Sequence, residues 1–438
     1  MKNTFKYILG LILISWFFAC EKPLELNPAQ SIDSEKLIVD ASSAEVAMNG
    51  LYSNVQDLFG GTMTITMDVA SDITDHTGTF PSWNDIDMSN PFPDNTGIDD
   101  GWVAGYALIY NANVVLDVLP TVDDPALDAA QFLGEARAIR AWTYFYLANI
   151  FGDVPLINTP VSVLADVNVA KSSASDVFNF VAGELTKSLA ELTGGVSGRI
   201  NADVVNAMLA KVYASTGNWS AAADAADAVI PNYTLVGNYM DLFNGSISSE
   251  AIFQIDFNST DGNSLSFYYW DTPGGRHEIG PSQTILDALT IGDARSASVD
   301  TTINSANGDW YITKYADFAL GTDKPILLRL ADILLIKAEA EAEAGNYGDA
   351  TTYFNMVRER SVPGGGITLD ASNFKDAILN ERMIELAWEA GHRWIDMQRS
   401  GLAASHVAAN GQDGCKAKWP IPRAEIDANT AMVQNPCY

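Results

Sequence analysis

The sequence has few of the residue types on which nucleic-acid binding and most catalysis depend. Only 25 of its 438 residues are lysine or arginine, against 55 aspartates and glutamates, and the formal net charge is −30. A chain of this sign repels phosphate backbones, which argues against nucleic acid as a partner. The four histidines show no metal-ligand spacing, and no nucleophile-elbow, zinc-protease, Walker or dinucleotide motif occurs. We therefore predict that the protein is not an enzyme, although a glycosidase needs only two neighbouring carboxylates.

Long hydrophobic runs are equally scarce. The main one follows two lysines at the N-terminus, where Tyr7–Ala19 is uncharged, too short to cross a bilayer, and typical of a signal-peptide core. It ends at Cys20, after a small residue, as in a bacterial lipobox. We predict a signal peptide over 1–19, lipidation of Cys20, and a tether over 20–41. The alternative is an ordinary signal peptide that contains a cysteine. No other stretch is expected to span a membrane.

Cysteine is rare too, with three residues in the chain. If Cys20 carries lipid, Cys415 and Cys437 remain near the C-terminus of an exported protein, where disulfides persist. We predict a bridge between these two cysteines, and the alternative is a pair of free thiols.

The periodicity of apolar residues predicts helices over four regions: about 42–59, 102–152, 175–230 and 329–400. Two segments rich in glycine, proline, aspartate and aromatic residues separate these regions, 60–101 and 232–328, and we predict that both are mostly loop. Ser42 followed by Glu45 predicts a capping box at the first helix. Residues 251–257 alternate enough to predict a short strand.

One internal repeat is visible. Residues 210–222 and 338–350, 128 positions apart, share small-residue helices, a Gly-Asn turn, an aromatic residue and an alanine three positions later. The unit resembles a tetratricopeptide helix–turn–helix, and the alternative is chance similarity between alanine-rich hairpins. The predicted fold is mainly α, one domain over 42–438 built of irregular tetratricopeptide-like helix pairs, with loop-rich insertions and little β-structure.

The two loop-rich segments carry clusters of aromatic and polar residues. An indole or phenol ring covers the apolar face of a sugar, while acids, amides, arginine and histidine bind its hydroxyls. We predict stacking residues and hydroxyl partners for such a ligand: Trp83, Tyr269 and Trp270 for stacking, and Asp72, Asp75, Arg276 and His277 for the hydroxyls. The alternative is that these aromatic residues only pin the loops to the body.

Two charged segments suggest further roles. The aspartates of 68–100 would suit calcium, but no EF-hand spacing occurs, so we predict a solvated loop and no cofactor. Residues 380–399 are rich in both charges, and Glu389 and Arg393 have the i,i+4 spacing of a helical ion pair. We interpret this segment as a structural ion network rather than an active site.

Four segments resemble, in order, the motifs of the SusD/RagB-like outer-membrane lipoproteins of Bacteroidetes: 134–156, 328–340, 380–399 and 419–429. The first contains the run Phe-Gly-Asp-Val-Pro at 151–155. Two departures occur, since Ala390 separates Glu389 from Gly391 where members usually have Glu-Gly, and Phe17-Phe18 is atypical of a lipobox. The resemblance implies a SusD-like fold.

The resemblance also implies a function. Members sit on the outer face of the outer membrane, cap a SusC-like TonB-dependent transporter, and bind oligo- or polysaccharide through loop aromatics without hydrolysing it. The same architecture could instead capture peptides or another nutrient. Two further functions fit the sequence: a surface glycoside hydrolase, and a tetratricopeptide adaptor without a small-ligand site.

Overall fold

The computed structural model describes residues 37–160, 168–194, 198–246, 248–270, 275–300 and 309–438. The predicted signal peptide, Cys20 and most of the tether lie outside the described residues. Helices dominate the fold and strands are few and short, so the predicted mainly α class is confirmed.

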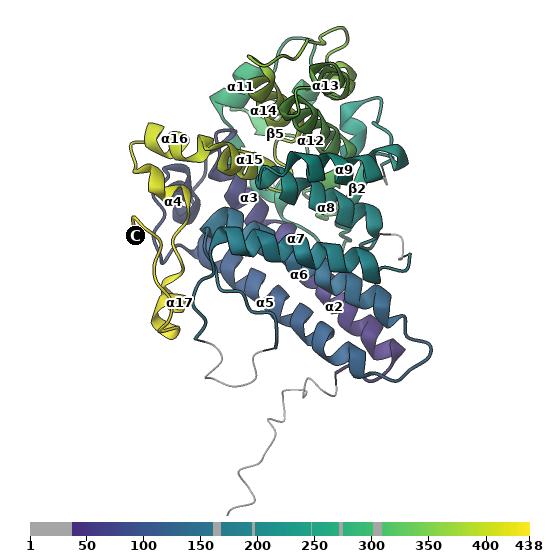
Figure 1. Ribbon diagram of the computed structural model, residues 1–438. Coiled ribbons are helices and arrows are strands. Elements are labelled where there is room, and N and C mark those ends of the chain that lie inside the picture. Colours follow the sequence, from purple (N-terminus) through teal and green to yellow (C-terminus); the bar gives the residue numbers. More distant parts are fainter. Residues whose placement is uncertain (1–36, 161–167, 195–197, 247, 271–274, 301–308) are drawn as a thin grey trace, which may run out of the picture.

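Eight helices form the scaffold: α2 (Ala41–Phe59), α5 (Thr96–Val118), α6 (Ala129–Phe151), α7 (Ala174–Glu191), α8 (Ala202–Ser215), α9 (Trp219–Val229), α12 (Leu330–Glu343) and α13 (Tyr347–Ser361). Each packs against the next in this series. Figure 1 shows α2, α5, α6 and α7 as neighbouring long helices, with α8, α9, α12 and α13 continuing the stack. Apolar side chains of α2 to α12 form the main core, and a second apolar cluster joins α12 to α13.

Side-chain caps set the starts of five of these helices, α2, α5, α6, α7 and α8. Asp128 accepts a hydrogen bond from the Gln131 amide at the start of α6, and α6 stops at Gly152, whose φ of 77° favours glycine. At α2 the predicted cap is wrong by two residues. Asp40 accepts from the Ser43 amide and Ser43 returns the bond, because an aspartate at the N-cap satisfies an amide of the first turn in place of Ser42.

The repeated unit predicted from the sequence is confirmed. Helices α8–α9 and α12–α13 form two hairpins, each closed by a glycine with positive φ, Gly217 at 71° and Gly345 at 83°. Trp219 and Tyr347 open the second helix of each hairpin. An alanine is buried three positions later in both, which lets the paired helices approach closely.

The segment 60–101 is more regular than predicted. It contains α3 (Thr62–Val69), strand β1 (Thr74–His76) and α4 (Pro81–Asp87), and α5 begins at Thr96 rather than near 102. Polar and apolar residues alternate at every second position of α3, so the 3.6-residue period that marks a surface helix is missing. The fold accommodates this pattern because the side chains from Met63 to Val69 are all buried. Asn95 caps α5 through the Gly97 amide.

The segment 232–328 is largely loop, as predicted, with short helices α10 (Leu265–Tyr269) and α11 (Gln283–Ala288). Among the described residues, its strands take part in three two-stranded antiparallel sheets. In these sheets β3 (Ile279–Pro281) pairs with β1 of the first loop-rich segment, β2 (Ala251–Gln254) with β6 (Ile326–Arg329), and β4 (Val299–Asp300) with β5 (Tyr311–Ile312). The strand predicted from Ala251 is therefore present, although it ends at Gln254. The β1–β3 pair joins the two loop-rich segments directly.

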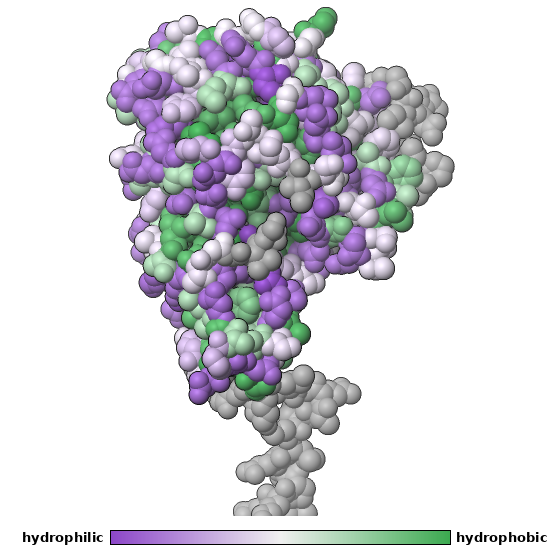
Figure 2. Space-filling view, turned by 90° about the vertical axis from the view of Figure 1, so that its right-hand side faces the viewer, coloured by the Kyte–Doolittle hydropathy of each residue, from purple (hydrophilic) through white to green (hydrophobic). Residues whose placement is uncertain are grey.

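The C-terminal part adds α14 (Phe374–Glu385), α15 (His392–Ser400), α16 (Leu402–Ala409) and α17 (Arg423–Ala428). Figure 1 shows α16 and α17 on the flank of the molecule that also carries α4. The face in Figure 2 mixes hydrophilic residues with small, separate hydrophobic groups, as expected for a surface in contact with water.

One helix departs from the expectation that nothing beyond the N-terminus could span a membrane. By length and composition, Thr96–Thr121 is long and apolar enough to cross a membrane, with a mean hydropathy of 1.3 in its most apolar window. In the fold, 56% of that window is buried, and α5 packs between α2 and α6. Its apolar composition thus serves the core of the helical stack.

Candidate functional site

The two loop-rich segments converge on a group of partly exposed side chains, which we call the loop cluster: Thr79, Phe80, Phe267, Tyr268 and Arg276. The rings of Phe80 and Tyr268 meet edge to face with centroids 5.9 Å apart. The Arg276 guanidinium lies over the Phe80 ring at 4.2 Å from its centroid. Aromatic edges and a cation are thus presented together at the surface.

Backbone pairing builds this cluster. The Thr77 amide donates to the Glu278 carbonyl at 2.9 Å, continuing the β1–β3 ladder beyond its last paired residues. The Glu278 amide in turn donates to the Tyr268 carbonyl at 2.8 Å. Gly78 is required here, because a Cβ at this position would lie 2.1 Å from the Glu278 carboxylate. The position of α10 relative to α4 is therefore fixed by main-chain contacts.

The Glu278 side chain anchors the same residues from beneath. Its carboxylate is 1% exposed and accepts hydrogen bonds from the Thr79 amide at 2.6 Å, the Phe80 amide at 3.0 Å and Arg276 Nε at 2.8 Å. Burial would raise the pKa of Glu278, but these donors offset the burial and hold its pKa below the usual range. An ionised Glu278 therefore orients both Arg276 and the turn that carries Phe80.

Two of the predicted stacking residues are buried, so the prediction that they are exposed to a ligand is wrong. Trp83 is 4% exposed, and its indole N–H donates to Thr66 Oγ1 at 3.1 Å. Tyr269 is completely buried. Trp83 and Tyr269 lie on the inward faces of two short helices, α4 and α10. The sequence pattern does not distinguish these helices from loop. Trp83 instead supports the loop cluster from below, with its ring 4.9 Å from that of Tyr268.

Trp270 keeps a partly exposed ring. Its indole N–H donates to the Tyr315 carbonyl at 2.8 Å, and its ring lies 6.1 Å from that of Phe318, which is 38% exposed. Trp310 is also exposed, at 43%. Phe318 was missed because it has no adjacent aromatic residue and lies outside the aromatic runs at 267–270 and 310–311.

The predicted hydroxyl partners separate into two groups. Arg276 and Asp75 are exposed, and Arg276 belongs to the loop cluster. His277 is nearly buried, with its ring 4.3 Å from that of Tyr311. Asp72 makes a two-bond ion pair with Arg393, at 2.6 Å to each nitrogen, so it faces away from the loop cluster. Among the seven predicted residues, Trp270, Asp75 and Arg276 thus remain open to a ligand in the loop-rich segments, whereas the partly exposed Asp72 lines a separate cavity.

Asp75 has an acidic neighbour. Burial, followed by the nearby Asp75 carboxylate, raises the pKa of Asp87 to about 6. Desolvation also raises the pKa of Asp75. Asp87 is the last residue of α4 and is partly exposed, and its backbone carbonyl accepts from Asn410 in the C-terminal part at 3.2 Å.

The charged segment 380–399 forms a buried ion network. Arg329 donates to Glu250 at 2.7 Å, to Glu385 at 2.6 Å and to Glu389 at 2.7 Å, and all four side chains are fully buried. Lys314, also fully buried, pairs with Glu389 at 2.8 Å. The charges neutralise each other inside the protein. This geometry fits the structural role that we predicted for the segment.

The specific pair predicted within that segment is wrong. Helix α14 ends at Glu385 and α15 begins at His392, so Glu389 and Arg393 do not share a helix. Positive φ values at Trp388 and Ala390 reverse the chain between the helices. Glu389 consequently turns to Lys314 and Arg329, whereas Arg393 reaches Asp72.

The structure pairs Cys415 with Cys437, and their Cα atoms are 6.1 Å apart, within the usual disulfide range. With Asp413 they form the one group of three potential metal donors among the residues that the structure describes, and its two sulfurs are bonded to each other.

Comparison with known proteins gives a consistent result along the chain. A model described as the SusD family matches residues 288–438, and one described as starch-binding, associating with outer membrane, matches residues 23–214. SusD-like protein P2 from Formosa agariphila is 27% identical over 98% of this chain and 99% of its own, and SusD-like protein P25 from the same organism is 26% identical over 98% and 97%.

Solved structures share the fold. A laminarin-binding SusD-like protein superposes with a TM-score of 0.81 at 24% identity, over 92% of this chain and 100% of its own. Surface glycan-binding protein A from Bacteroides thetaiotaomicron, in complex with laminarihexaose, gives 0.77 at 18% identity, over 91% and 100%. Since the two family models match most of the sequence, in the N-terminal and C-terminal halves alike, the chain belongs to the SusD/RagB-like family.

Proposed function

We propose that the protein is a cell-surface lipoprotein that binds oligo- or polysaccharide without cleaving it and delivers it to a SusC-like TonB-dependent transporter. The observation that carries the proposal is the loop cluster, in which aromatic rings and an exposed arginine lie together at the surface. Two relatives in fold are named for binding laminarin or are bound to laminarihexaose, which supports a glycan as the ligand class.

The chemistry of the cluster suits a sugar. The partly exposed rings of Phe80, Phe267 and Tyr268 offer apolar surface to the C–H face of a pyranose. Arg276 retains donors beyond its bonds to Glu278 and Thr79, and Asp75 is an exposed acceptor nearby on β1. A second aromatic pair, that of Trp270 with Phe318, lies on the same loop-rich part of the chain. A polymer long enough to contact both groups would gain affinity from each.

A binding role fits the carboxylates better than a hydrolytic one. Glu250, Glu385 and Glu389 are buried and ion-paired, so they cannot reach a surface glycan. Asp75 and Asp87 are the acidic neighbours in the loop region, and the raised pKa of Asp87 resembles that of a general acid. This pair is the specific observation that favours a second candidate function, a glycoside hydrolase, and a cleavage assay separates the two.

The anchor, the outer-membrane location and the transporter are proposed from the sequence and the family. Labelling cells with a fatty-acid analogue would show incorporation into the wild-type chain and none into Cys20→Ser. Co-purification of a TonB-dependent transporter with the tagged protein would support the partner. Recovery of a soluble, unlabelled wild-type chain would refute the anchor.

The test of ligand binding is native affinity electrophoresis of the chain from residue 37 onward. The gels would contain α-glucan, laminarin, β-1,4-glucan, fructan, mannan, xylan or pectin. We expect retardation by one glycan class and weakening by several-fold in Tyr268→Ala and in Arg276→Ala, since each removes one stacking or hydroxyl contact. Arg423→Ala is the matched control, because Arg423 is an exposed arginine on α17 paired with exposed Asp94.

Three different outcomes contradict parts of the proposal. Release of reducing ends from the retained glycan, abolished by Asp87→Asn, would establish the hydrolase instead. Retardation that persists unchanged in both loop variants would refute the loop cluster as the site. Binding of peptides but of no glycan would favour peptide capture by the same architecture.

A further inference from the structure

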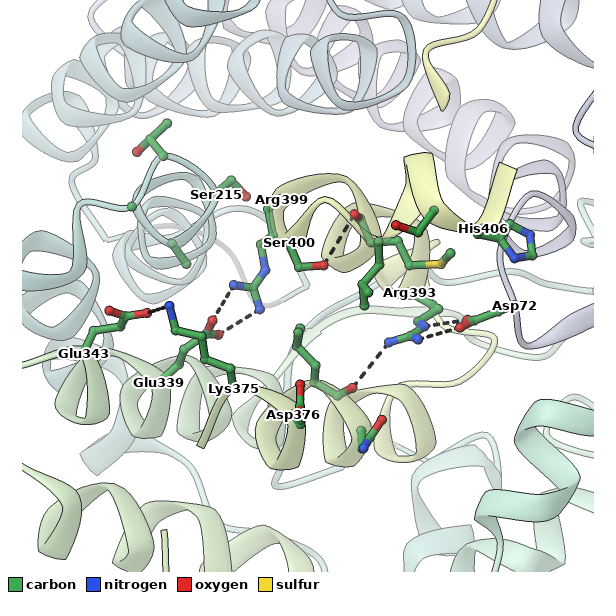
Figure 3. Close-up of a pocket in the computed structure, with 18 of the residues that line it drawn as sticks. Asp72, Ser215, Glu339, Glu343, Lys375, Asp376, Arg393, Arg399, Ser400 and His406 are labelled. Carbon is green, nitrogen blue, oxygen red and sulfur yellow. Dashed lines mark hydrogen bonds and ion pairs between the residues drawn. The ribbon is translucent and has the colours of Figure 1, made fainter. Parts of the chain in front are cut away.

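A cavity of about 1150 Å³ lies outside the loop cluster, and none of its lining residues belongs to that cluster. Its walls come from the end of α8, the α8–α9 turn, the start of α9, α11, α12, α14, α15, α16 and the residue stretch that precedes β1. Figure 3 shows an elongated hollow, with Glu339, Glu343 and Lys375 at one end and Asp72 and His406 at the other. Its volume is at the upper end of the range for small-molecule sites in proteins.

The ionic side chains of this cavity are mostly neutralised by one another. Arg393 pairs with Asp72 at 2.6 Å, as the dashed lines in Figure 3 show. Arg399 pairs with Glu339 at 2.7 Å, and Lys375 with Glu343 at 3.0 Å. A charged ligand would have to break one of these pairs to gain a partner. The cavity is therefore poorly suited to a phosphate, a free carboxylate or a peptide terminus.

Several neutral hydrogen-bonding groups in the same walls remain available. Six neutral polar lining residues have no side-chain hydrogen bond or ion pair with any residue that the structure describes: Ser215, Trp219, Thr284, Asn380, Ser405 and His406. Burial lowers the pKa of His406, so its imidazole is neutral at pH 7. Trp219, which is partly exposed, adds an indole ring to these donors and acceptors.

We propose that this cavity is a second glycan site, which takes a neutral oligosaccharide. Neutral hydroxyls match hydroxyl, amide and imidazole groups that lack protein partners, and the indole suits the C–H face of a sugar ring. The ion pairs make the walls polar, and the one lining acid without an ion pair, the exposed Asp376, can accept from a sugar hydroxyl and would repel an anion. The choice of ligand class rests on the proposed function, whereas the location rests on the cavity alone.

The experiment combines calorimetry with hydrogen–deuterium exchange on the chain from residue 37. The ligands are laminarihexaose and one neutral hexasaccharide from each of the remaining glycan classes of the electrophoresis panel. Asn380→Ala removes an exposed amide of the cavity without disturbing the core. Ser405→Trp fills the cavity from an exposed position on α16, and Ser220→Ala is the matched control, since Ser220 is exposed beside Trp219 but does not line the cavity.

We expect two equivalents of one hexasaccharide to bind, with slowed exchange both around Phe80 and Tyr268 and around the α8–α9 turn and the start of α14. Asn380→Ala should weaken the second equivalent at least several-fold, and Ser405→Trp should abolish it, while Ser220→Ala behaves as wild type. Tyr268→Ala should leave the protection around the cavity intact.

The outcomes separate the two sites. One equivalent, protection confined to the loop cluster, and unchanged binding in Ser405→Trp would overturn the second site and leave the proposed function standing. Protection confined to the cavity would support the second site and refute the loop cluster. If no hexasaccharide binds, the second site is overturned, and the polymer electrophoresis decides the proposed function separately.

Discussion

Replacing Glu389 tests whether the buried charges of 380–399 hold the fold together or act on a ligand. In Glu389→Gln the shape is kept but the negative charge is lost. The wild-type carboxylate accepts from Lys314 Nζ at 2.8 Å and from Arg329 at 2.7 and 3.0 Å. The glutamine keeps one acceptor oxygen, so about two charge-assisted bonds are lost, each contributing roughly 1.5–3 kcal/mol. We expect unfolding to become easier by about 3–5 kcal/mol, the usual cost of removing one partner of a buried ion pair.

The assay is urea unfolding at pH 7, followed by far-ultraviolet circular dichroism. Asp94→Asn is the control, because the Arg423–Asp94 pair is exposed and should contribute less than about 0.5 kcal/mol. Glycan retardation by folded Glu389→Gln should equal that of wild type. A stability within about 1 kcal/mol of wild type, combined with lost glycan binding, would refute the structural role and give Glu389 a direct part in function.

The direction of the Glu389 pKa shift determines how the stability from its ion pairs changes with pH. Burial would raise the pKa of Glu389, but Arg329 and Lys314 offset the burial and hold its pKa below the usual value. The ion pairs therefore contribute fully above the pKa of an unfolded glutamate, and their contribution declines only as the pH falls towards the lower folded pKa. Glu389→Gln should accordingly lose most of its difference from wild type in strong acid and keep it at neutral pH.

Three further predictions concern different parts of the chain. Because the pKa of Asp87 is raised to about 6, its ionisation destabilises the fold as the pH rises from about 4 to 6. After allowance for the partial exposure of Asp87, Asp87→Asn should raise the free energy of unfolding by about 1–2 kcal/mol at pH 7.5 and by little at pH 4. Urea unfolding that shows equal gains at pH 7.5 and pH 4 would contradict this prediction. Replacing Cys415 and Cys437 by alanine should lower the free energy of unfolding by about 3 kcal/mol, since the bridge spans 22 positions. A thiol titration that finds both thiols free in the wild type would refute this prediction. Trp83→Ala should lower the free energy of unfolding by about 3–5 kcal/mol, and with it the melting temperature. A variant that melts like wild type but no longer binds glycan would show that Trp83 contacts the ligand after all.

The scaffold was predictable because helices on the outside of a stack carry local signals. Buried residues recur every three to four positions in α7, whereas α6 is buried on all sides from Ala138 to Phe151 and was recognised by its end signal, Gly152. The end of α6 at Phe151 and the start of α7 at Ala174 each lie one residue from the predicted boundary. The repeated hairpins were visible from a glycine, an aromatic residue and an alanine alone. Helix α3 escaped prediction because its residues alternate between polar and apolar at every second position, the period of a strand, and its described side chains from Met63 to Val69 are all buried.

The loop cluster was only partly predictable, since it depends on contacts between distant residues. The aromatic content of both loop-rich segments indicated the right regions, but not which rings face outward. The short helix α4 decides that Phe80 rather than Trp83 faces outward. The short helix α10 decides in the same way that Tyr268 rather than Tyr269 faces outward. Asp72 was misplaced for a similar reason, because its partner Arg393 lies 321 positions away.

The ion network suggests how one scaffold can carry loops of different sequence. Arg295, Lys314 and Arg329 come from the loop-rich segment or its end, and all are buried. Their acidic partners include Glu385 and Glu389, which belong to the segment that resembles the family motif. Cations within the loops are thus held by a fixed acidic centre in the scaffold, and a lone unpaired charge there would be costly. The surface residues of the loops carry no such constraint, so the ligand contacts can change while the buried attachment of the loops is kept.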